Sequence, residues 1–449
     1  MELKRRIKIN DVALKKRGDY VLYWMQAAQR TQENHALYEA MMIANHYQKP
    51  LVVLFILDEG FKDGNLRHFK FMLEGLHDVK ANLNAMKARF VLKRSAMIKG
   101  ISPYLQNATA IIMDDAYLKP LRALKARVAK LAQIQKVPAF YVPSNVIVPV
   151  DKASDKLEYA ARTIRKKLRQ KAPDYLGEIP RDITLDYQRN KSDKIPKLDE
   201  IKVPYIEPVE AYIGGENEAL KRLEAFLAKG LYHYDNDNFD PAKEKGTSHL
   251  SAYLHFGHIA PTLIYRKVKQ AALADEKLNA SANAFLEQLL VRRELAHNFV
   301  WYLDGYDTFE AMSVPWAYET MKKHKHDQRP YLYNKDDYLK LKTHDVYFNA
   351  AMAQMLKTGY MHNRMRMYWG KKIIEWSQDY ETAYETILSL NNTYLLDGRD
   401  PSTYASVAWC FGRHDQAWKE RAIFGKLRYM NEKGLKRKSH IDDYLKRWL

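Results

Sequence analysis

The chain has 449 residues, of which 47% are hydrophobic and 28% charged, a composition that excludes a disordered protein and allows two domains. Lys and Arg number 73 against 54 Asp and Glu, and the net charge of +19 favours a polyanionic partner such as nucleic acid. Lysines that only keep the surface soluble would give the same excess. The single cysteine, Cys410, excludes internal disulfides and cysteine-based metal sites, and we expect no metal.

The N-terminal sequence MELKRRIKIN lacks the apolar core of a signal peptide, and no later run approaches 18 apolar residues. The basic residues are scattered and form no juxtamembrane block. We therefore expect a cytoplasmic protein with no membrane partner.

The first third of the chain alternates short apolar runs with segments of helical spacing such as NHALYEAMMIANHY. The runs that predict buried strands are Tyr20–Met25, Pro50–Leu57, Ala88–Leu92, Thr109–Asp115 and Pro138–Pro143. This alternation predicts a Rossmann-like α/β domain over residues 1–165, with a parallel sheet covered by helices on both faces. No Gly-rich dinucleotide fingerprint follows the first strand, so a classical NAD site is not supported.

From residue 166 to 212 the composition shifts to prolines and charges, as in KAPDYLGEIPRD and KSDKIPKLDEIKVPYIEP. Such a segment indicates a long interdomain connector. Beyond it, residues 213–449 carry helical patterns almost throughout and no strand-like runs. The second domain is therefore predicted to be all-α and larger than the first.

The stretch YMHNRMRMYWGKKIIEW, from residue 360 to 376, combines aromatics, methionines and arginines in one helical pattern. One stripe of that helix contains Met365, Trp369, Ile373 and Trp376, and Arg366 projects from a neighbouring face. For an isolated helix, such a stripe is more often core packing than a functional surface.

Two polar segments favour a functional site in the same domain. Residues 397–401, DGRDP, form a compact turn with three charges between apolar flanks, and a buried carboxylate there needs a partner such as Arg366. Thr247, Ser248 and Ser251 lie at the start of a helical pattern, where hydroxyls and free backbone N–H groups bind phosphate oxygens. Taken alone, these hydroxyls are more simply read as helix caps.

Several long motifs resemble the photolyase and cryptochrome flavoproteins, and most closely the class II cyclobutane pyrimidine dimer photolyases. They occur in the expected order along almost the whole chain: YWMQAAQRTQENHAL, FMLEGL, LEYAARTIRKKL, LSAYLHFG, MHNRMRMYW, LDGRDP and AWCFGRHDQAW. The resemblance implies light-driven electron transfer from a reduced FAD to a pyrimidine dimer flipped out of double-stranded DNA, by a monomeric enzyme.

The resemblance also implies that FAD lies inside the helical domain, in a U shape. The residues carried over as cofactor-binding are Tyr234, Thr247, Ser248, His249, Leu250, Ser251, Asn363, Arg366, Asn391, Asp397, Gly398 and Arg399. Among them, Asp397 is expected to pair with Arg366 near the isoalloxazine ring, and Asn391 to lie against flavin N5.

Other matched residues imply an electron path and a lesion site. Trp376 and Trp369 match the proximal and distal tryptophans of a wire that carries electrons to the flavin in light. Met367 and Trp409 match residues that line the lesion pocket, and Arg428 matches a basic residue that fills the bubble left in the duplex. Flipping costs a few kcal/mol and is cheaper at a damaged base, which contributes to selectivity.

The sequence departs from the class II pattern at four positions. Gln288 replaces a glutamate, and as a neutral amide it can hydrogen-bond but cannot supply a proton. Arg292 replaces a lesion-stacking tryptophan and offers a planar cation in place of an apolar wedge. Asn238 stands where an arginine is expected, and Phe348 stands at the middle of the tryptophan wire, where it should impair electron hopping.

These departures leave three functions open. The first is dimer repair with an altered pocket. The second is a cryptochrome-like photoreceptor or a flavoprotein that acts on another lesion, and the third is a non-catalytic DNA-binding flavoprotein. A second chromophore in the first domain is also open between deazaflavin, folate and none, because Ala28 replaces the acidic residue of a family motif.

Overall fold

The N-terminal part of the computed structural model is a six-stranded sheet, in the order β1-β6-β5-β2-β3-β4. The structure describes residues 4–449 except 15–16, 115, 181–183 and 187–190. All neighbouring strands are parallel except β1, which pairs with β6 in antiparallel fashion. The strands are β1 (Ile7–Lys8), β2 (Tyr20–Met25), β3 (Leu51–Leu57), β4 (Arg89–Arg94), β5 (Ala108–Asp114) and β6 (Ala139–Val142).

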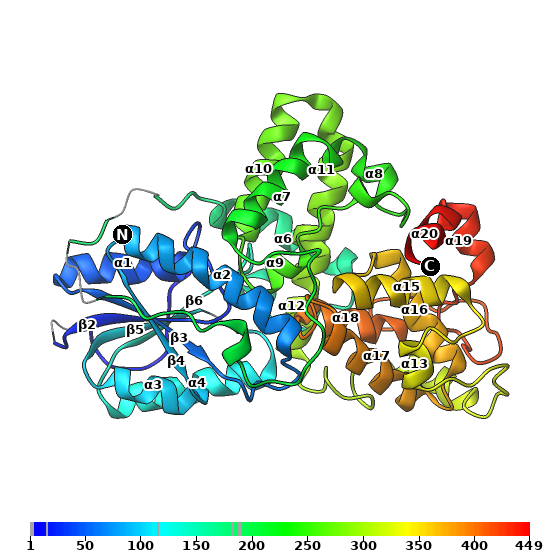
Figure 1. The fold of residues 1–449 in the computed structure, drawn as a ribbon, viewed down its shortest axis with the longest axis horizontal. Coiled ribbons are helices and arrows are strands. Elements are labelled where there is room, and N and C mark those ends of the chain that lie inside the picture. The colour runs from blue at the N-terminus through cyan, green and yellow to red at the C-terminus, as the bar shows by residue number, and fades with distance from the viewer. Residues whose placement is uncertain (1–3, 15–16, 115, 181–183, 187–190) are drawn as a thin grey trace.

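The central strands are buried on both faces because helices cover each side of the sheet (Figure 1). The first face packs against α1 (His35–Tyr47) and α2 (Leu66–Ala85), and the second against α3 (Met97–Leu105) and α4 (Lys119–Ile134). Successive residues of β2 alternate between the two cores, as the pleat requires. The predicted α/β domain is confirmed, with the short edge strand β1 added to it.

The domain boundary predicted at residue 165 falls inside α6 (Ala161–Lys171), which follows the short helix α5 (Val150–Ala153). The buried side of α6 packs with helices of the C-terminal half. After α6 the chain forms two short 3-10 turns, and Leu185 and Ile201 return to the core of the sheet domain. The connector therefore lies against the first domain, where Asp193 bonds the backbone of β4.

The remaining chain is helical, as predicted. Its first group of helices shares one hydrophobic core and comprises α7 (Glu216–Ala228), α8 (Tyr234–Asp237), α9 (Ser251–His255), α10 (Pro261–Ala274) and α11 (Asn279–Leu286). A π-helical segment, η6 (Glu287–Arg292), continues α11 into α12 (Arg293–Tyr302). Short π-helical segments are frequent at functional sites.

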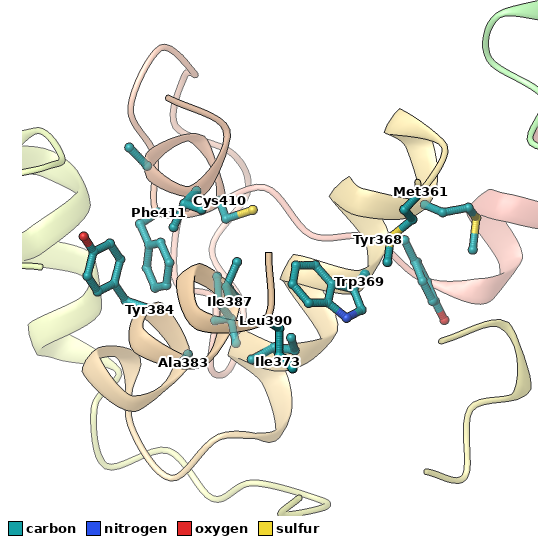
Figure 2. Close-up of a cluster of buried hydrophobic side chains, with 14 of the residues drawn as sticks. Met361, Tyr368, Trp369, Ile373, Ala383, Tyr384, Ile387, Leu390, Cys410 and Phe411 are labelled. Atoms are coloured by element: carbon teal, nitrogen blue, oxygen red, sulfur yellow. The ribbon is translucent and has the colours of Figure 1, made fainter. Parts of the chain in front are cut away.

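The second group surrounds α16 and shares a separate hydrophobic core, part of which Figure 2 shows. It comprises α13 (Pro315–Lys323), α14 (Lys335–Leu339), α15 (Val346–Thr358), α16 (Asn363–Trp376), α17 (Tyr380–Tyr394), α18 (Pro401–Cys410), α19 (Glu432–Lys438) and α20 (Ile441–Trp448). Gly370 lets α16 approach α18 closely, because a Cβ there would lie 2.8 Å from Cys410 Sγ.

Buried polar contacts fasten the two domains together. The Arg30 guanidinium donates to the carbonyl of Gly257 at 2.9 Å, and that glycine has a φ of +69° in a turn pressed against residue 27. Arg67 of α2 donates to the carbonyls of Met355 at 3.2 Å and Leu356 at 2.7 Å. Because these donors are charged and buried, separating the domains would leave them unsatisfied. The sheet domain is a fixed support for the helical one.

Candidate flavin and lesion site

The predicted ion pair is present at the start of α16. Arg366 Nη2 donates to Asp397 Oδ2 at 2.8 Å, and Arg366 Nε donates to the Met361 carbonyl at 3.0 Å. The two charged side chains are only 21% and 11% exposed, so the pair is largely shielded from water. Burial alone would lower the Arg366 pKa, but the charge and hydrogen bond of Asp397 outweigh it and raise that pKa above its ordinary value.

The second oxygen of Asp397 is free for a ligand. Asp397 Oδ1 is buried and has no hydrogen-bond partner in the described part of the chain. A buried carboxylate oxygen left unpaired is costly, and a ligand N–H group is a suitable donor for it. The turn itself is tightly fixed, since a Cβ on Gly398 would lie 2.8 Å from the Asn391 carbonyl.

The other predicted residues of the turn have different roles. Asn391 of α17 is buried, and its amide donates to Thr403 Oγ1 at 3.0 Å, directly below the turn. Arg399 instead reaches the first domain, where its guanidinium donates to the Asp63 carbonyl at 3.2 Å and contacts His68. Arg399 therefore anchors the turn to the first domain.

A cavity of about 520 Å³ lies near this pair, although neither Arg366 nor Asp397 is among its lining residues. Three of the predicted residues line it, Thr247, Ser248 and His249, whereas Tyr234, Leu250 and Ser251 are not in its lining. Tyr360 lies between the cavity and the Arg366–Asp397 pair. Its hydroxyl lies 3.3 Å from Thr247 Oγ1. Five cations around the cavity favour an anionic ligand, namely Arg222, Lys229, Lys243, Lys245 and Arg447.

No pattern in the sequence marks Tyr360, Arg222 or Arg447 as residues of this cavity. Tyr360 is the first residue of the helical stretch 360–376, but in the sequence it is only one of several aromatic residues there. Arg222 stacks on Tyr212 at 4.6 Å and belongs to a helix about 140 residues upstream of α16. Asn363 is the first residue of α16 and is exposed, with no cavity contact.

The two tryptophans of the expected wire lie in the core around α16. Trp369 and Trp376 are 2% and 1% exposed, and Phe348 packs edge-on against Trp376 at 5.2 Å. Along the helix axis, Trp369 is about 5 Å from Arg366 and Trp376 about 15 Å. This order makes Trp369 the tryptophan nearer to Arg366 and Asp397, the reverse of the proximal and distal places expected from the sequence.

Two of the expected lesion residues, Trp409 and Arg428, lie around the end of α18. The Arg428 guanidinium donates to both carboxylate oxygens of Asp415, at 2.7 and 2.8 Å, and stacks on Trp418 at 4.2 Å. Trp409 lies 5.6 Å from the same guanidinium and 5.1 Å from Lys371 Nζ. Arg428 is thus held in place and is only 30% exposed, whereas Trp418 is 42% exposed.

Lys371, which lies beside Trp409, is a residue of this region that the sequence did not indicate. It is fully buried, and its ammonium group donates to the Cys410 carbonyl at 2.5 Å. Burial lowers its pKa to about 8. Asp415, which follows His414 in the sequence, forms its ion pair with Arg428.

The π-helical segment η6 carries two of the departures. Gln288 is exposed, and the Arg292 side chain is 54% exposed with its Nε 4.0 Å from Glu287. Burial lowers the pKa of His414 to about 4, with Arg413 and Arg292 contributing, so Arg292 lies near the loop that follows α18. His414 in turn bonds the Tyr159 carbonyl at 2.7 Å. The loop that follows α18 therefore lies close both to η6 and to the residues just before α6.

Comparisons with known proteins decide the family. A model described as DNA photolyase matches residues 21–183. A deoxyribodipyrimidine photo-lyase from Methanothermobacter thermautotrophicus is 41% identical over 435 residues, covering 96% of this chain and 95% of the relative. The chain belongs to the DNA photolyase family.

A second relative agrees with the family assignment, and a solved structure shares the fold. A deoxyribodipyrimidine photo-lyase from Arabidopsis thaliana is 36% identical, covering 95% of this chain and 88% of the relative. A crystal structure of a bacterial class III photolyase from Agrobacterium tumefaciens has a TM-score of 0.74 at 18% identity, covering 98% of this chain and 87% of that chain. The latter likeness supports the shared fold.

Membership of the photolyase family implies an FAD cofactor, and the residues present fit one. The buried, unpartnered Asp397 oxygen can accept from a flavin N–H group, and the cavity lined by Thr247 and Ser248 is surrounded by cations that suit a diphosphate. No helix in the described ranges is both long and apolar enough to cross a membrane.

Proposed function

We propose that the chain repairs cyclobutane pyrimidine dimers in double-stranded DNA by light-driven electron transfer, with FAD as its cofactor. The observation that carries the proposal is the shielded Arg366–Asp397 pair, whose second carboxylate oxygen is buried and has no partner among the described residues, together with the cation-lined cavity nearby. The names of the full-length relatives support the same substrate class.

The bound flavin would supply the light-excited electron donor, and residues of this chain would hold and tune it. Asp397 would accept a hydrogen bond from the ring, and Arg366 would stabilise negative charge beside it. Asn391, fixed by Thr403, would offer its amide to the ring. The cavity cations would neutralise the diphosphate, which is otherwise costly to enclose.

The lesion would enter between η6 and the end of α18. Trp409 would provide an apolar surface for the flipped bases, and Gln288 would hydrogen-bond to them in place of a carboxylic acid. Arg292 would stack on a base as a planar cation and attract the backbone as well. The net charge of +19 would strengthen binding through phosphate contacts.

Repair of a defined oligonucleotide tests the proposal. A duplex with one thymine dimer is incubated with reduced, flavin-containing protein under blue light, and a dark sample serves as control. Restored duplex in light only is the expected result. Tight binding of the damaged duplex without repair would refute dimer repair and favour the DNA-binding alternative, whereas equal affinity for damaged and undamaged DNA would favour a photoreceptor.

The Gln288→Glu variant makes the same assay informative about the altered pocket. It restores the carboxyl group of the class II pattern at an exposed position, where the fold should tolerate it. We expect a higher yield of repaired dimers per absorbed photon, with unchanged flavin content. An unchanged or lower yield would mean that Gln288 does not contact the lesion.

Three further proposals concern the state of the protein. We propose a monomer that acts in the cytoplasm, and gel filtration with and without duplex tests the first point. A second chromophore, deazaflavin or folate, stays a prediction. An absorption spectrum of the purified protein tests it, because an antenna adds a near-ultraviolet or violet band to those of the flavin.

A further inference from the structure

Beyond Trp376, the structure continues the row of aromatic rings toward the surface. Trp376 is the last residue of α16, and the Tyr333 ring lies 5.5 Å from it at an angle of 78°. The Tyr333 backbone N–H donates to the Trp376 carbonyl at 3.1 Å, which fixes the segment before α14 against the end of the helix. His344 lies 5.0 Å from the same indole.

Tyr333 and His344 form a hydrogen-bonded phenol and imidazole. The Tyr333 hydroxyl lies 3.0 Å from His344 Nδ1 and accepts the His344 backbone N–H at 3.1 Å. In the tautomer with its proton on Nε2, the imidazole accepts the Tyr333 hydroxyl proton at Nδ1. Burial lowers the pKa of His344, which keeps the ring neutral and able to accept a proton at pH 7.

A third ring leads from this pair to solvent. Tyr331 stacks on His344 with a centroid separation of 3.6 Å and lies nearly parallel to Tyr333, 6.1 Å away. It is 46% exposed. The rings of Trp376, Tyr333 and Tyr331 therefore form a continuous series from the buried core to the surface, with His344 beside the middle ring.

We propose that Tyr333 and His344 act as a proton-coupled electron donor to oxidised Trp376, and that Tyr331 extends this relay to the surface. The proposal rests on the proposed function, because a bound flavin would supply the light-driven oxidant, and electrons drawn through the tryptophans would leave Trp376 as a radical cation. Tyr333 then gives one electron to Trp376 and its hydroxyl proton to His344 Nδ1. The products are neutral Trp376, a neutral tyrosyl radical and protonated His344.

The hydrogen bond is what selects Tyr333 among nearby tyrosines. A phenol that loses an electron becomes a strong acid, so a base already in hydrogen-bond contact lowers the barrier to its oxidation. Tyr338 packs on Phe348 at 5.0 Å and lies 6.3 Å from Tyr333, but it makes no ring contact with a histidine. Tyr347, next to Phe348 in sequence, directs its hydroxyl to Asp442 of α20.

The relay changes the outcome of photoreduction. A Trp376 radical cation can recover its electron from the flavin, which cancels the light reaction. Transfer of the proton to His344 lowers the driving force for that return, because the tyrosyl radical must regain both an electron and a proton. Tyr331 then offers the oxidised site to a reductant in solution.

Electron paramagnetic resonance of the illuminated, flavin-containing full chain tests the relay without any DNA. We expect a tyrosyl signal in the unmodified chain and in Tyr338→Phe, the matched control, and its loss in Tyr333→Phe. His344→Phe keeps a ring on Tyr331 but removes the proton acceptor, and we expect it to lose the signal as well. Persistence of the tyrosyl signal in Tyr333→Phe would overturn the assignment.

A second measurement applies if Phe348 impairs electron transfer so much that few radicals form. The same variants are compared in a Phe348→Trp background, and the decay of the tryptophan radical is followed optically in H2O and D2O. We expect slower decay in D2O for the parent and no solvent dependence after Tyr333→Phe. Flavin with a tryptophan radical but no tyrosyl radical in this background overturns the relay alone. Protein that holds no flavin overturns the proposed function, and the relay with it.

Discussion

The Asp397→Asn substitution is the sharpest test of the flavin site. In the folded chain, Arg366 Nη2 lies 2.8 Å from Asp397 Oδ2, so the new amide must turn its oxygen toward Arg366. Its NH2 group then takes the place of Oδ1, the oxygen that has no partner among the described residues. The change therefore removes the acceptor offered to the cofactor and leaves the Arg366 charge unbalanced.

Two magnitudes follow. Loss of a hydrogen bond to a charged group costs about 1.5 to 3 kcal/mol, so FAD affinity should fall about 10- to 100-fold. Breaking a buried ion pair by removing one partner costs about 3 to 5 kcal/mol, and the 21% exposure of Arg366 places the loss of unfolding free energy at about 3 kcal/mol.

The assay combines flavin fluorescence titration of the apoprotein with urea unfolding. Asp336→Asn is the matched control, because that carboxylate pairs with Lys340 at 2.6 Å while the two side chains are 70% and 58% exposed. An exposed pair of this kind contributes little to stability, and FAD affinity should not change. An Asp397→Asn protein that binds FAD as tightly as the unmodified chain would refute the assignment of this carboxylate to the cofactor.

Three other substitutions have defined outcomes. Phe348→Trp should speed photoreduction of the flavin, measured by loss of oxidised-flavin absorbance under blue light, and an unchanged rate would show that Phe348 does not interrupt the wire. Arg428→Ala leaves the Asp415 carboxylate, which is 7% exposed, without its partner and should lower both Tm and affinity for dimer-containing duplex; adding Asp415→Asn should restore the Tm only. Burial raises the pKa of Glu294 to about 7, above its unfolded value, so its contribution to stability is present below about pH 4 and is lost as the pH rises through 7. Glu294→Gln should therefore flatten the fall in Tm between pH 5 and pH 8, and a parallel fall in both proteins would contradict that pKa.

The sequence by itself determined the architecture, because each element depends on neighbouring residues. The apolar runs of β2, β3 and β5 are buried on both faces, which is why they read as central strands of a parallel sheet. The helical spacing of the C-terminal half predicted its helices for the same local reason. The edge strand β1 was not predicted, because its two residues, Ile7–Lys8, are too few to carry a periodic signal. They join the sheet only by backbone pairing with β6.

The Arg366–Asp397 pair was also predictable, although 31 residues separate its members. A charged turn between apolar flanks needs a buried partner, and the helix of residues 360–376 supplied an arginine at the edge of its apolar stripe. The resemblance to photolyases selected the same two residues. The need of a buried carboxylate for a partner, and the presence of an arginine beside the apolar stripe, were enough to predict this ion pair.

Only the tertiary structure decided the rest of the site, because its contacts join segments whose approach no local pattern encodes. Arg428 is expected in the DNA bubble, but only the fold shows that Asp415 holds its guanidinium and that Trp418 stacks on it. The order of Trp369 and Trp376 along the electron path depends on where Asp397 packs on α16. The bond from Tyr333 to His344 depends on how the segment before α14 folds back on Trp376. Burial and hydrogen-bond direction are properties of the assembled core, and they select which of 31 tyrosines and 15 histidines can act together.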